Sequence, residues 1–302
     1  MIKFITYTYF FQLKIDLLYK NMVLFIIEYE RIKMKKFIII FILLIISVIL
    51  YARFIGTSNY KIVEHTIKIE NLNESFNGFK IVQFSDLLIG STKTIGDLEN
   101  IVNDINNIDA DIIVFTGDLI NENYNISNEE IEQIKENLRN LDCTLYKYAV
   151  IGDNDLENYK EIMTDSNFIV LDNESNYIFY EDITPIKITG ITDTSNIEKA
   201  LSTTDNLETM YNIVLTHYPD NIDSLAEYDI DLVLAGHSLL GQIRLPFIGG
   251  IIRKDGARKY IDNYYEVNNT KMYVSSGLGI DNNYYYRLFN KSEINLYRLS
   301  SE

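Results

Sequence analysis

Short apolar runs alternate with amphipathic segments along the chain from about residue 60 onward. Three of these runs have the length and apolar character of buried strands, and each is followed by a stretch with helical periodicity. The runs occupy residues 79–84, 111–116 and 145–151, and the helical stretches occupy 94–107, 127–140 and 156–163. Ser127 with Glu130 three residues later forms a capping box, which predicts where the second helix begins. Three strand–helix units in series indicate a parallel sheet with helical crossovers.

The second half of the chain is richer in short, β-branched and aromatic runs, which predict strands more often than helices. We expect a first strand at residues 61–70 and a short helix at 197–201. Further strands are expected at 168–171, 177–181, 186–191, 211–216, 230–234, 242–245, 259–265, 271–275 and 294–298. The pattern therefore predicts one α/β domain with two sheets.

Before this domain, residues 37–52 form an apolar run that follows the basic cluster of Arg31, Lys33, Lys35 and Lys36. Sixteen helical residues span about 24 Å, so Arg53–Ile55 would be needed to cross the roughly 30 Å hydrocarbon core. The alternative is a buried core helix, but the run is apolar all round. We expect a single-pass anchor at residues 34–56, with the basic side cytoplasmic and a domain at 57–302 outside the cell membrane.

Residues 1–33 fit this anchor poorly, since Met34-Lys35-Lys36 before an apolar run resembles a natural start. One hypothesis is that these residues are an uncertain extension from a mis-assigned start. The other is that they form a weakly amphipathic segment on the membrane surface.

Composition narrows the classes of function. The first 60 residues contain eight Lys and Arg against three Asp and Glu, whereas the remainder contains 19 against 40. An acidic domain argues against nucleic acid or anionic lipid as a ligand of its whole surface. Cys143 is the only cysteine, which excludes an intrachain disulfide and a cysteine zinc site.

Polar residues follow five of the predicted strands: Asp86, Asp118, Asp153, His217 and His237. The carboxyl ends of parallel strands meet at one edge of a sheet, so these side chains are expected to converge. Carboxylates and imidazoles together suit a divalent transition metal of the Mn, Fe or Zn class. The third histidine, His65, lies within a predicted strand and is expected to have no role in the site.

The ordered set resembles the calcineurin-like metallophosphoesterase family, in particular its membrane-anchored bacterial branch. The corresponding blocks are Asp86-Leu87-Leu88, Gly117-Asp118, Gly152-Asp153-Asn154-Asp155, Thr216-His217 and Gly236-His237-Ser238-Leu239. Gly241–Pro246, Val274–Gly279 and Arg287–Asn290 extend the resemblance over roughly residues 60–300. It implies a four-layer α/β/β/α sandwich of two mixed sheets, and two bridged divalent ions that activate water for attack on a phosphate ester.

Three histidines of the family pattern are replaced in this chain, by Leu88, Asn154 and Leu239. By position, the resemblance implies a first ion held by Asp86, Asp118 and the two residues that are now leucines. It implies a second ion held by four residues that can all bind a metal here, with Asp153 in place of the family's asparagine: Asp118, Asp153, His217 and His237. Asn154 takes the place of the histidine that assists the leaving group, and an amide is no general acid at neutral pH.

These replacements favour a family member that binds one ion and has impaired or lost two-metal catalysis. An active one-metal phosphohydrolase and a non-catalytic extracytoplasmic binding module are the alternatives. Arg244 and Arg287 are candidate substrate-binding residues for phosphate. The expected ligand is a phosphate-containing small molecule or envelope component, and no nucleic acid is expected.

Overall fold

The computed structural model describes residues 2–301 except 71, 156, 182, 202–207, 210 and 282, with the backbone alone for residues 2–9. The chain divides into two compact units, Met1–Tyr51 and Ala52–Glu302. The first unit is a single long helix, and the second contains all of the strands that are described.

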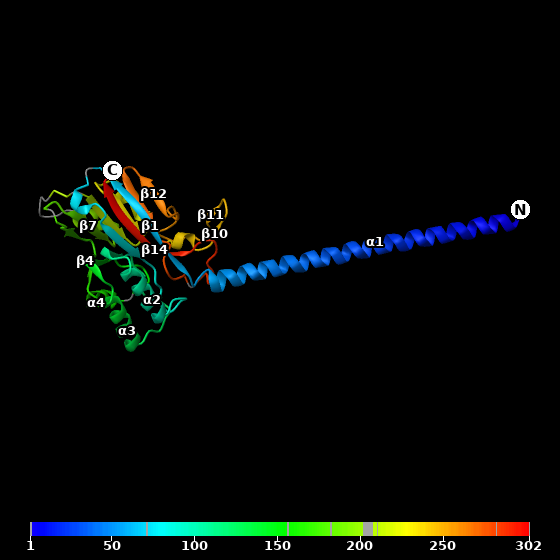
Figure 1. Cartoon of the computed structure of the whole chain (residues 1–302), viewed down its shortest axis with the longest axis horizontal. Coiled ribbons are helices and arrows are strands. Elements are labelled where there is room, and N and C mark those ends of the chain that lie inside the picture. Colours follow the sequence, from blue (N-terminus) through cyan, green and yellow to red (C-terminus); the bar gives the residue numbers. More distant parts are fainter. Residues whose placement is uncertain are drawn as a thin grey trace. The chain divides into compact units, whose positions relative to one another are not determined.

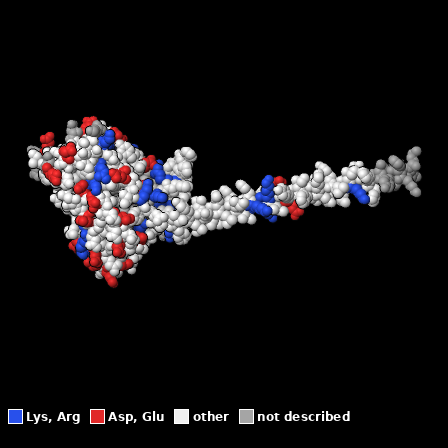
Figure 2. Space-filling model, viewed as in Figure 1, with Lys and Arg blue, Asp and Glu red and all other residues white. Residues whose placement is uncertain are grey.

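The first unit is helix α1 (Ile2–Leu50), which continues into a π-helical turn, Tyr51–Ile55. Its 49 residues correspond to about 74 Å, more than twice the roughly 30 Å of a bilayer core. Within Phe10–Ile55 the helix is long and apolar enough to cross a membrane. The basic cluster that begins at Arg31 forms a charged band within this helix (Figure 2). The apolar stretch that follows this band is the candidate membrane span.

The second unit contains two six-stranded mixed sheets. In the first sheet, β2, β3, β4 and β5 run parallel, and β14 pairs with β2 in the antiparallel sense. The strand order of this sheet is β1 (Tyr60–Ile69), β14 (Ser292–Ser301), β2 (Lys80–Phe84), β3 (Ala110–Phe115), β4 (Cys143–Ala149) and β5 (Phe168–Val170). Three helices follow its parallel strands: α2 (Ile95–Asn106), α3 (Asn128–Arg139) and α4 (Tyr159–Asp165).

The second sheet has a parallel centre flanked by an antiparallel strand at each edge. Its strand order is β12 (Tyr264–Val267), β13 (Thr270–Val274), β9 (Leu232–Ala235), β8 (Tyr211–Thr216), β7 (Ile186–Ile191) and β6 (Glu174–Ile178). Two short helices accompany it, α5 (Ile197–Leu201) and α6 (Ile222–Leu225). A small hairpin of β10 (Arg244–Leu245) and β11 (Gly249–Gly250) lies outside both sheets.

Alternating side chains of the central strands pack on opposite faces and produce the layers. In β3, Ile112 and Val114 belong to the core between the two sheets, whereas Ile113 and Phe115 pack with the residues of α2, α3 and α4. In β8, Val214 belongs to a third cluster with residues of α5 and α6. Figure 1 shows α2, α3 and α4 together on one side of this unit. The predicted four-layer α/β/β/α fold is confirmed.

Most predicted elements are present, but the strand predicted at residues 259–265 is wrong, since β12 begins only at Tyr264. The backbone N–H groups of residues 258–260 donate to the Asp220 carboxylate, and those of Ile261 and Asp262 donate to the Tyr265 hydroxyl. Side chains thus satisfy the groups that a neighbouring strand would otherwise pair. The helix predicted from residue 156, which lies outside the described residues, begins at Tyr159.

The capping box of α3 gives a test of the local signals. Ser127 Oγ accepts a hydrogen bond from Glu130 N, and the Glu130 carboxylate accepts one from Ser127 N at 2.9 Å. We expect Ser127→Ala to lower the free energy of unfolding by about 1 kcal/mol, because it leaves a helix N–H without its partner. Chemical denaturation of the full chain in detergent measures this change. An unchanged midpoint would show that the box does not stabilise the fold.

Candidate metal centre

The five predicted site residues all follow strands that end at the same edge of the sandwich. The first sheet contributes carboxylates after β2, β3 and β4, and the second contributes imidazoles after β8 and β9. Four of the five converge, with one ligand atom each within 4.8 Å of the others: Asp118, Asp153, His217 and His237. The site is therefore built across the two sheets, and its two types of ligand come from different sheets.

The distances from the two imidazole nitrogens to their neighbours in this cluster are close to those between ligands of one small ion. His217 Nε2 lies 3.0 Å from Asp153 Oδ1 and 3.4 Å from Asp118 Oδ1. His237 Nδ1 lies 3.0 Å from Asp153 Oδ1 and 3.1 Å from His217 Nε2. Four ligands at the usual bond lengths of a tetrahedral zinc-type ion lie about 3.4 Å from one another. The residues present therefore fit a divalent transition metal.

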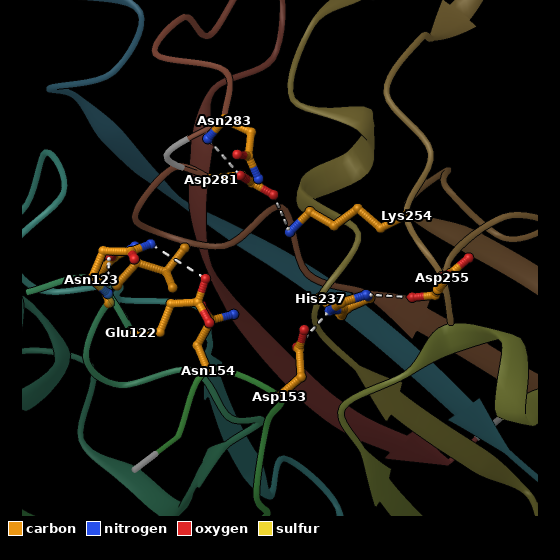
Figure 3. A pocket seen from close by; sticks show the side chains of 11 residues that line it. Glu122, Asn123, Asp153, Asn154, His237, Lys254, Asp255, Asp281 and Asn283 are labelled. Atoms are coloured by element: carbon orange, nitrogen blue, oxygen red, sulfur yellow. Dashed lines mark hydrogen bonds and ion pairs between the residues drawn. The ribbon is translucent and has the colours of Figure 1, made fainter.

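Backbone carbonyls orient both imidazole rings. His217 Nδ1 donates to Thr116 O at 2.6 Å, and His237 Nε2 donates to Asp255 O at 2.7 Å. Each ring thus points its other nitrogen into the cluster, as Figure 3 shows for His237 between Asp153 and Asp255. A histidine that binds a metal usually donates its remaining N–H in this way, which fixes the tautomer and the ring orientation.

The electrostatics of the cluster favour a cation at its centre. Burial alone would lower the pKa of His217, but the Asp118 and Asp153 carboxylates outweigh it and raise the pKa well above its usual value. Burial acts to raise the pKa of Asp153, yet hydrogen bonds to His217 and His237 hold it well below its usual range. The carboxylates of Asp118 and Asp153 lie beside His217 and stabilise positive charge there, whether a proton or a metal ion supplies it.

Asn154 holds one of the carboxylates in place. Its backbone N–H donates to Asp118 Oδ1 and its side-chain amide donates to Asp118 Oδ2, both at 2.9 Å. The amide at the predicted general-acid position is therefore turned toward a candidate metal ligand. Its chemistry is to orient Asp118, since an amide carries no proton that it can release at neutral pH.

Asp155 is a structural residue of the site whose role the sequence pattern did not reveal. Its carboxylate accepts from the backbone N–H groups of Asp118, Leu119 and Gly152 at 3.0, 2.8 and 2.7 Å. These bonds tie the loop after β3 to the loop after β4. The loops approach so closely that a Cβ on Gly152 would lie 2.3 Å from Asp118 Oδ1. The close approach explains the glycine in this block.

At the position where the resemblance implies the first ion, the side chains differ from those of the family pattern. The Asp86 carboxylate accepts from Ser85 Oγ at 2.5 Å and from His237 N at 3.1 Å, and it lies outside the four-residue cluster. Leu88 and Leu239 are buried beside the glycine-containing loop after β13: a Cβ on Gly279 would meet Leu88, and one on Gly277 would meet Leu239. Leu240 packs elsewhere, in the cluster behind β9. Apolar side chains thus occupy the two positions where the resemblance implies histidines.

Backbone strain persists around these leucines. Leu88 and Leu239 have φ values of 46° and 48°, and Asp86, Asp118 and His237 also have positive φ. Such conformations cost of order 1–3 kcal/mol each and are concentrated at functional sites. Both leucine positions therefore share the left-handed backbone that Asp86, Asp118 and His237 have at the same edge.

A polar cavity of about 180 Å³ opens beside the cluster, lined by Asp153, Asn154, His237 and Leu88 among others. Lys254 also lines it and pairs with Asp281 at 3.2 Å, with both side chains 17% exposed. Figure 3 shows this pair across the cavity from Asn154. Lys254 is thus the basic side chain that faces the cavity, and no motif in the sequence indicates it.

The two arginines predicted to bind substrate do not line this cavity. Arg244 donates to Leu240 O and Ile261 O and pairs with Asp262. Arg287 is fully buried and donates from Nη2 to Ser276 O and Gly279 O, while its Nε and Nη1 have no hydrogen-bond partner. In this structure both arginines hold loops together, and Lys254 is the basic side chain that lines the cavity.

A sequence model of the calcineurin-like phosphoesterase family matches residues 79–240, the segment that carries all five strand-end residues. The chain belongs to this family. It is 32% identical to the uncharacterized metallophosphoesterase YkuE of Bacillus subtilis over 83% of this chain and 89% of that protein. It is 28% identical to an uncharacterized metallophosphoesterase of Helicobacter pylori over 74% of this chain and 60% of that protein.

Other relatives of this metallophosphoesterase-family chain include a protein with a named substrate. UDP-2,3-diacylglucosamine pyrophosphatase LpxG of Chlamydia trachomatis is 25% identical over 69% of this chain and 81% of that protein. In a comparison of structures, the similarity to a dimetal phosphatase from Danio rerio covers 67% of this chain and 88% of that protein's chain. The sequence identity is 9% and the TM-score is 0.37.

Gly152 offers a test of how tightly the two loops are packed. We expect Gly152→Ala to lower the free energy of unfolding by about 1–3 kcal/mol, because the added methyl would overlap Asp118. Gly96→Ala in α2 is the matched control, since a Cβ there meets only Thr94 Oγ1, at 3.7 Å. Thermal denaturation of both variants measures the difference. Equal stability of the two variants would contradict the close packing.

Proposed function

We propose that this protein binds a single divalent transition-metal ion through Asp118, Asp153, His217 and His237. We further propose that it retains little of the two-metal phosphoesterase activity of its family. One observation carries the proposal. The four ligands of one ion converge with both imidazoles oriented inward, whereas two positions of the other ion are the buried leucines Leu88 and Leu239.

The expected loss of activity follows from what each missing part contributes. In two-metal hydrolases the ion pair lowers the pKa of the attacking water and stabilises both the attacking and the leaving oxygen. Loss of a positioned charge or proton donor typically costs about 10²–10⁴ in rate. Here one ion site and the proton donor are missing together, although such effects need not multiply.

The surviving half still supports ligand binding. An ion held by this cluster would polarise an oxygen of a phosphate group in the adjoining cavity. Lys254 supplies a cationic side chain on the cavity wall, and Asn154 keeps Asp118 oriented. The proposed ligand is a phosphate-containing small molecule or envelope component. The name of the relative LpxG, a pyrophosphatase of a diacylated glucosamine nucleotide, supports this class.

One-metal hydrolysis is the second candidate function. The cavity reaches Asp153 and His237 as well as Lys254, so an ion and a phosphate group could lie side by side there. Both this function and the proposed one require a single bound ion, so only a measurement of hydrolysis distinguishes them. A non-catalytic binding module without metal remains the third hypothesis.

The proposed location is the cell membrane, with residues 34–56 as the anchor and residues 57–302 as an extracytoplasmic domain. The long apolar helix within Phe10–Ile55 supports the anchor. The basic band that includes Arg31 and Lys36 supports the orientation, because basic flanks are retained on the cytoplasmic side.

Removal of one imidazole tests the metal ligands. We expect His217→Ala to weaken Mn²⁺ or Zn²⁺ binding by at least about 10-fold, since changes around metal sites typically cost 10–100-fold in affinity. His65→Ala is the matched control, because His65 contacts Asn295 and stacks on Tyr297 away from the cluster. Metal titration of the full-length protein gives both affinities. Equal affinities for the two variants would remove His217 from the site.

Restoring the missing groups tests the assignment of impaired catalysis. We expect Leu88→His, Asn154→His and Leu239→His together to raise phosphodiester hydrolysis with Mn²⁺ by about 10² or more. The unmodified protein, assayed in parallel, is expected to bind metal and show little turnover. Turnover in the unmodified protein equal to that of the triple variant would support one-metal hydrolysis instead. Absence of metal binding would support the binding module.

A further inference from the structure

Two loops, one of which contacts residues 52–56, expose an unusual amount of apolar and aromatic surface. In the turn between β10 and β11, Phe247 is fully exposed and Ile248 is 73% exposed. The second loop precedes β14 and contains Tyr284–Phe289. In it, Tyr285 is 51% and Phe289 is 66% exposed. We call this surface the apolar rim, formed by Phe54, Ile55, Phe247, Ile248, Tyr285 and Phe289. Single exposed apolar residues are ordinary, but a contiguous group of them marks an interaction surface.

The two loops form one surface because they are bonded to each other. Ile243 forms a β-bridge with Leu288, and Arg244 N donates to Leu288 O at 2.9 Å. The buried Gln242 side chain donates to the backbone carbonyls of Tyr284 and Tyr286. Neither loop can move away from the other without breaking these bonds.

The same surface is bonded to the residues where the apolar run of the anchor ends. Arg287 N donates to Ala52 O at 3.0 Å, and the Arg53 guanidinium lies 5.8 Å from the Tyr285 ring centroid. Gly56 lies so close to Arg287 that a Cβ on it would meet Arg287 O at 2.0 Å. These contacts lie within the Ala52–Glu302 unit. An anchor that leaves the hydrocarbon at residues 53–55 therefore brings the rim to the surface of the bilayer.

We propose that the apolar rim inserts into the same bilayer that the N-terminal helix crosses. Tyr285 would lie at the boundary between hydrocarbon and headgroups, where tyrosine is enriched, and the apolar Phe247 and Phe289 would be buried just below it. Arg53, which lies over the Tyr285 ring, is placed where basic side chains contact headgroup phosphates. In Figure 2, Lys and Arg side chains gather on the side of the domain where Figure 1 labels β10 and β11.

This docking would hold the mouth of the cavity at the membrane surface. Lys254 lines the cavity four residues after Gly250, the last residue of β11, and Asn283 lines it immediately before Tyr284 of the second loop. The phosphate-containing ligand would then come from the headgroup layer. The docking rests on the proposed anchor and not on catalysis, so it can fail while the metal site stands.

The absence of tryptophan from the chain allows a direct test with single-tryptophan variants. Full-length Phe247→Trp is reconstituted into vesicles of phosphatidylcholine and phosphatidylglycerol, with or without bromine on the acyl chains. A side chain buried about 5–10 Å below the headgroup boundary lies close to the bromines, so we expect about half of its emission or more to be quenched. Phe247 is fully exposed, so its replacement should leave the fold intact.

Two further variants serve as controls. Phe179→Trp places the probe at a half-exposed phenylalanine after β6, at the opposite edge of the second sheet from β12, and it should not be quenched. Phe41→Trp lies in the apolar run of the anchor and should be quenched strongly.

Each other outcome overturns the docking. Quenching of the Phe41→Trp variant, with no more quenching of Phe247→Trp than of Phe179→Trp, would keep the anchor and refute the docking. Blue-shifted emission from Phe247→Trp that bromine does not quench would show a second copy of the chain on the rim. Unquenched emission from Phe41→Trp would refute the anchor and the docking together, whereas metal binding measured on the same samples would remain as the separate test of the proposed function.

Discussion

The site depends on a constraint of charge. His217 and His237 are each fixed by a backbone carbonyl, so that two imidazole nitrogens face each other at 3.1 Å beside the oxygens of Asp118 and Asp153. Lone pairs held this close repel one another unless a cation lies among them. A metal ion satisfies all four groups at once, and without one a proton on His217 must supply part of the positive charge. The loops that follow strands of both sheets hold these four groups together.

The missing half of the site obeys a different requirement, that of packing. Leu88 and Leu239 fill space beside Gly279 and Gly277. The Asp86 carboxylate accepts hydrogen bonds from the Ser85 hydroxyl and the His237 backbone N–H. The left-handed backbone at both leucines is nevertheless kept. Packing therefore replaces ligation in one half of the edge while the other half keeps its donors.

The five strand-end residues and an α/β domain with two sheets could be predicted from the sequence because both follow local rules, whereas the four-layer order came from the resemblance to a known family. An apolar run that ends in a polar residue marks the edge of a parallel sheet wherever it occurs. The directions of side chains could not be predicted in this way. Arg244 and Arg287 donate to backbone carbonyls instead of lining the cavity, whereas Lys254, which no motif marks, lines it. The strand expected at 259–265 failed for a similar reason, since the distant Asp220 carboxylate takes its N–H groups.

The central claim is that the site holds one ion instead of a bridged pair. The electron paramagnetic resonance spectrum of the Mn²⁺-loaded full-length protein tests it most directly, because two ions about 3.5–4 Å apart couple magnetically. The account predicts the signal of an isolated, protein-bound Mn²⁺ ion that saturates at one equivalent per chain, with further Mn²⁺ adding only the signal of the free aqueous ion. The multiline signal of a coupled Mn²⁺ pair would contradict it, because that signal requires a second ion beside Leu88 and Leu239.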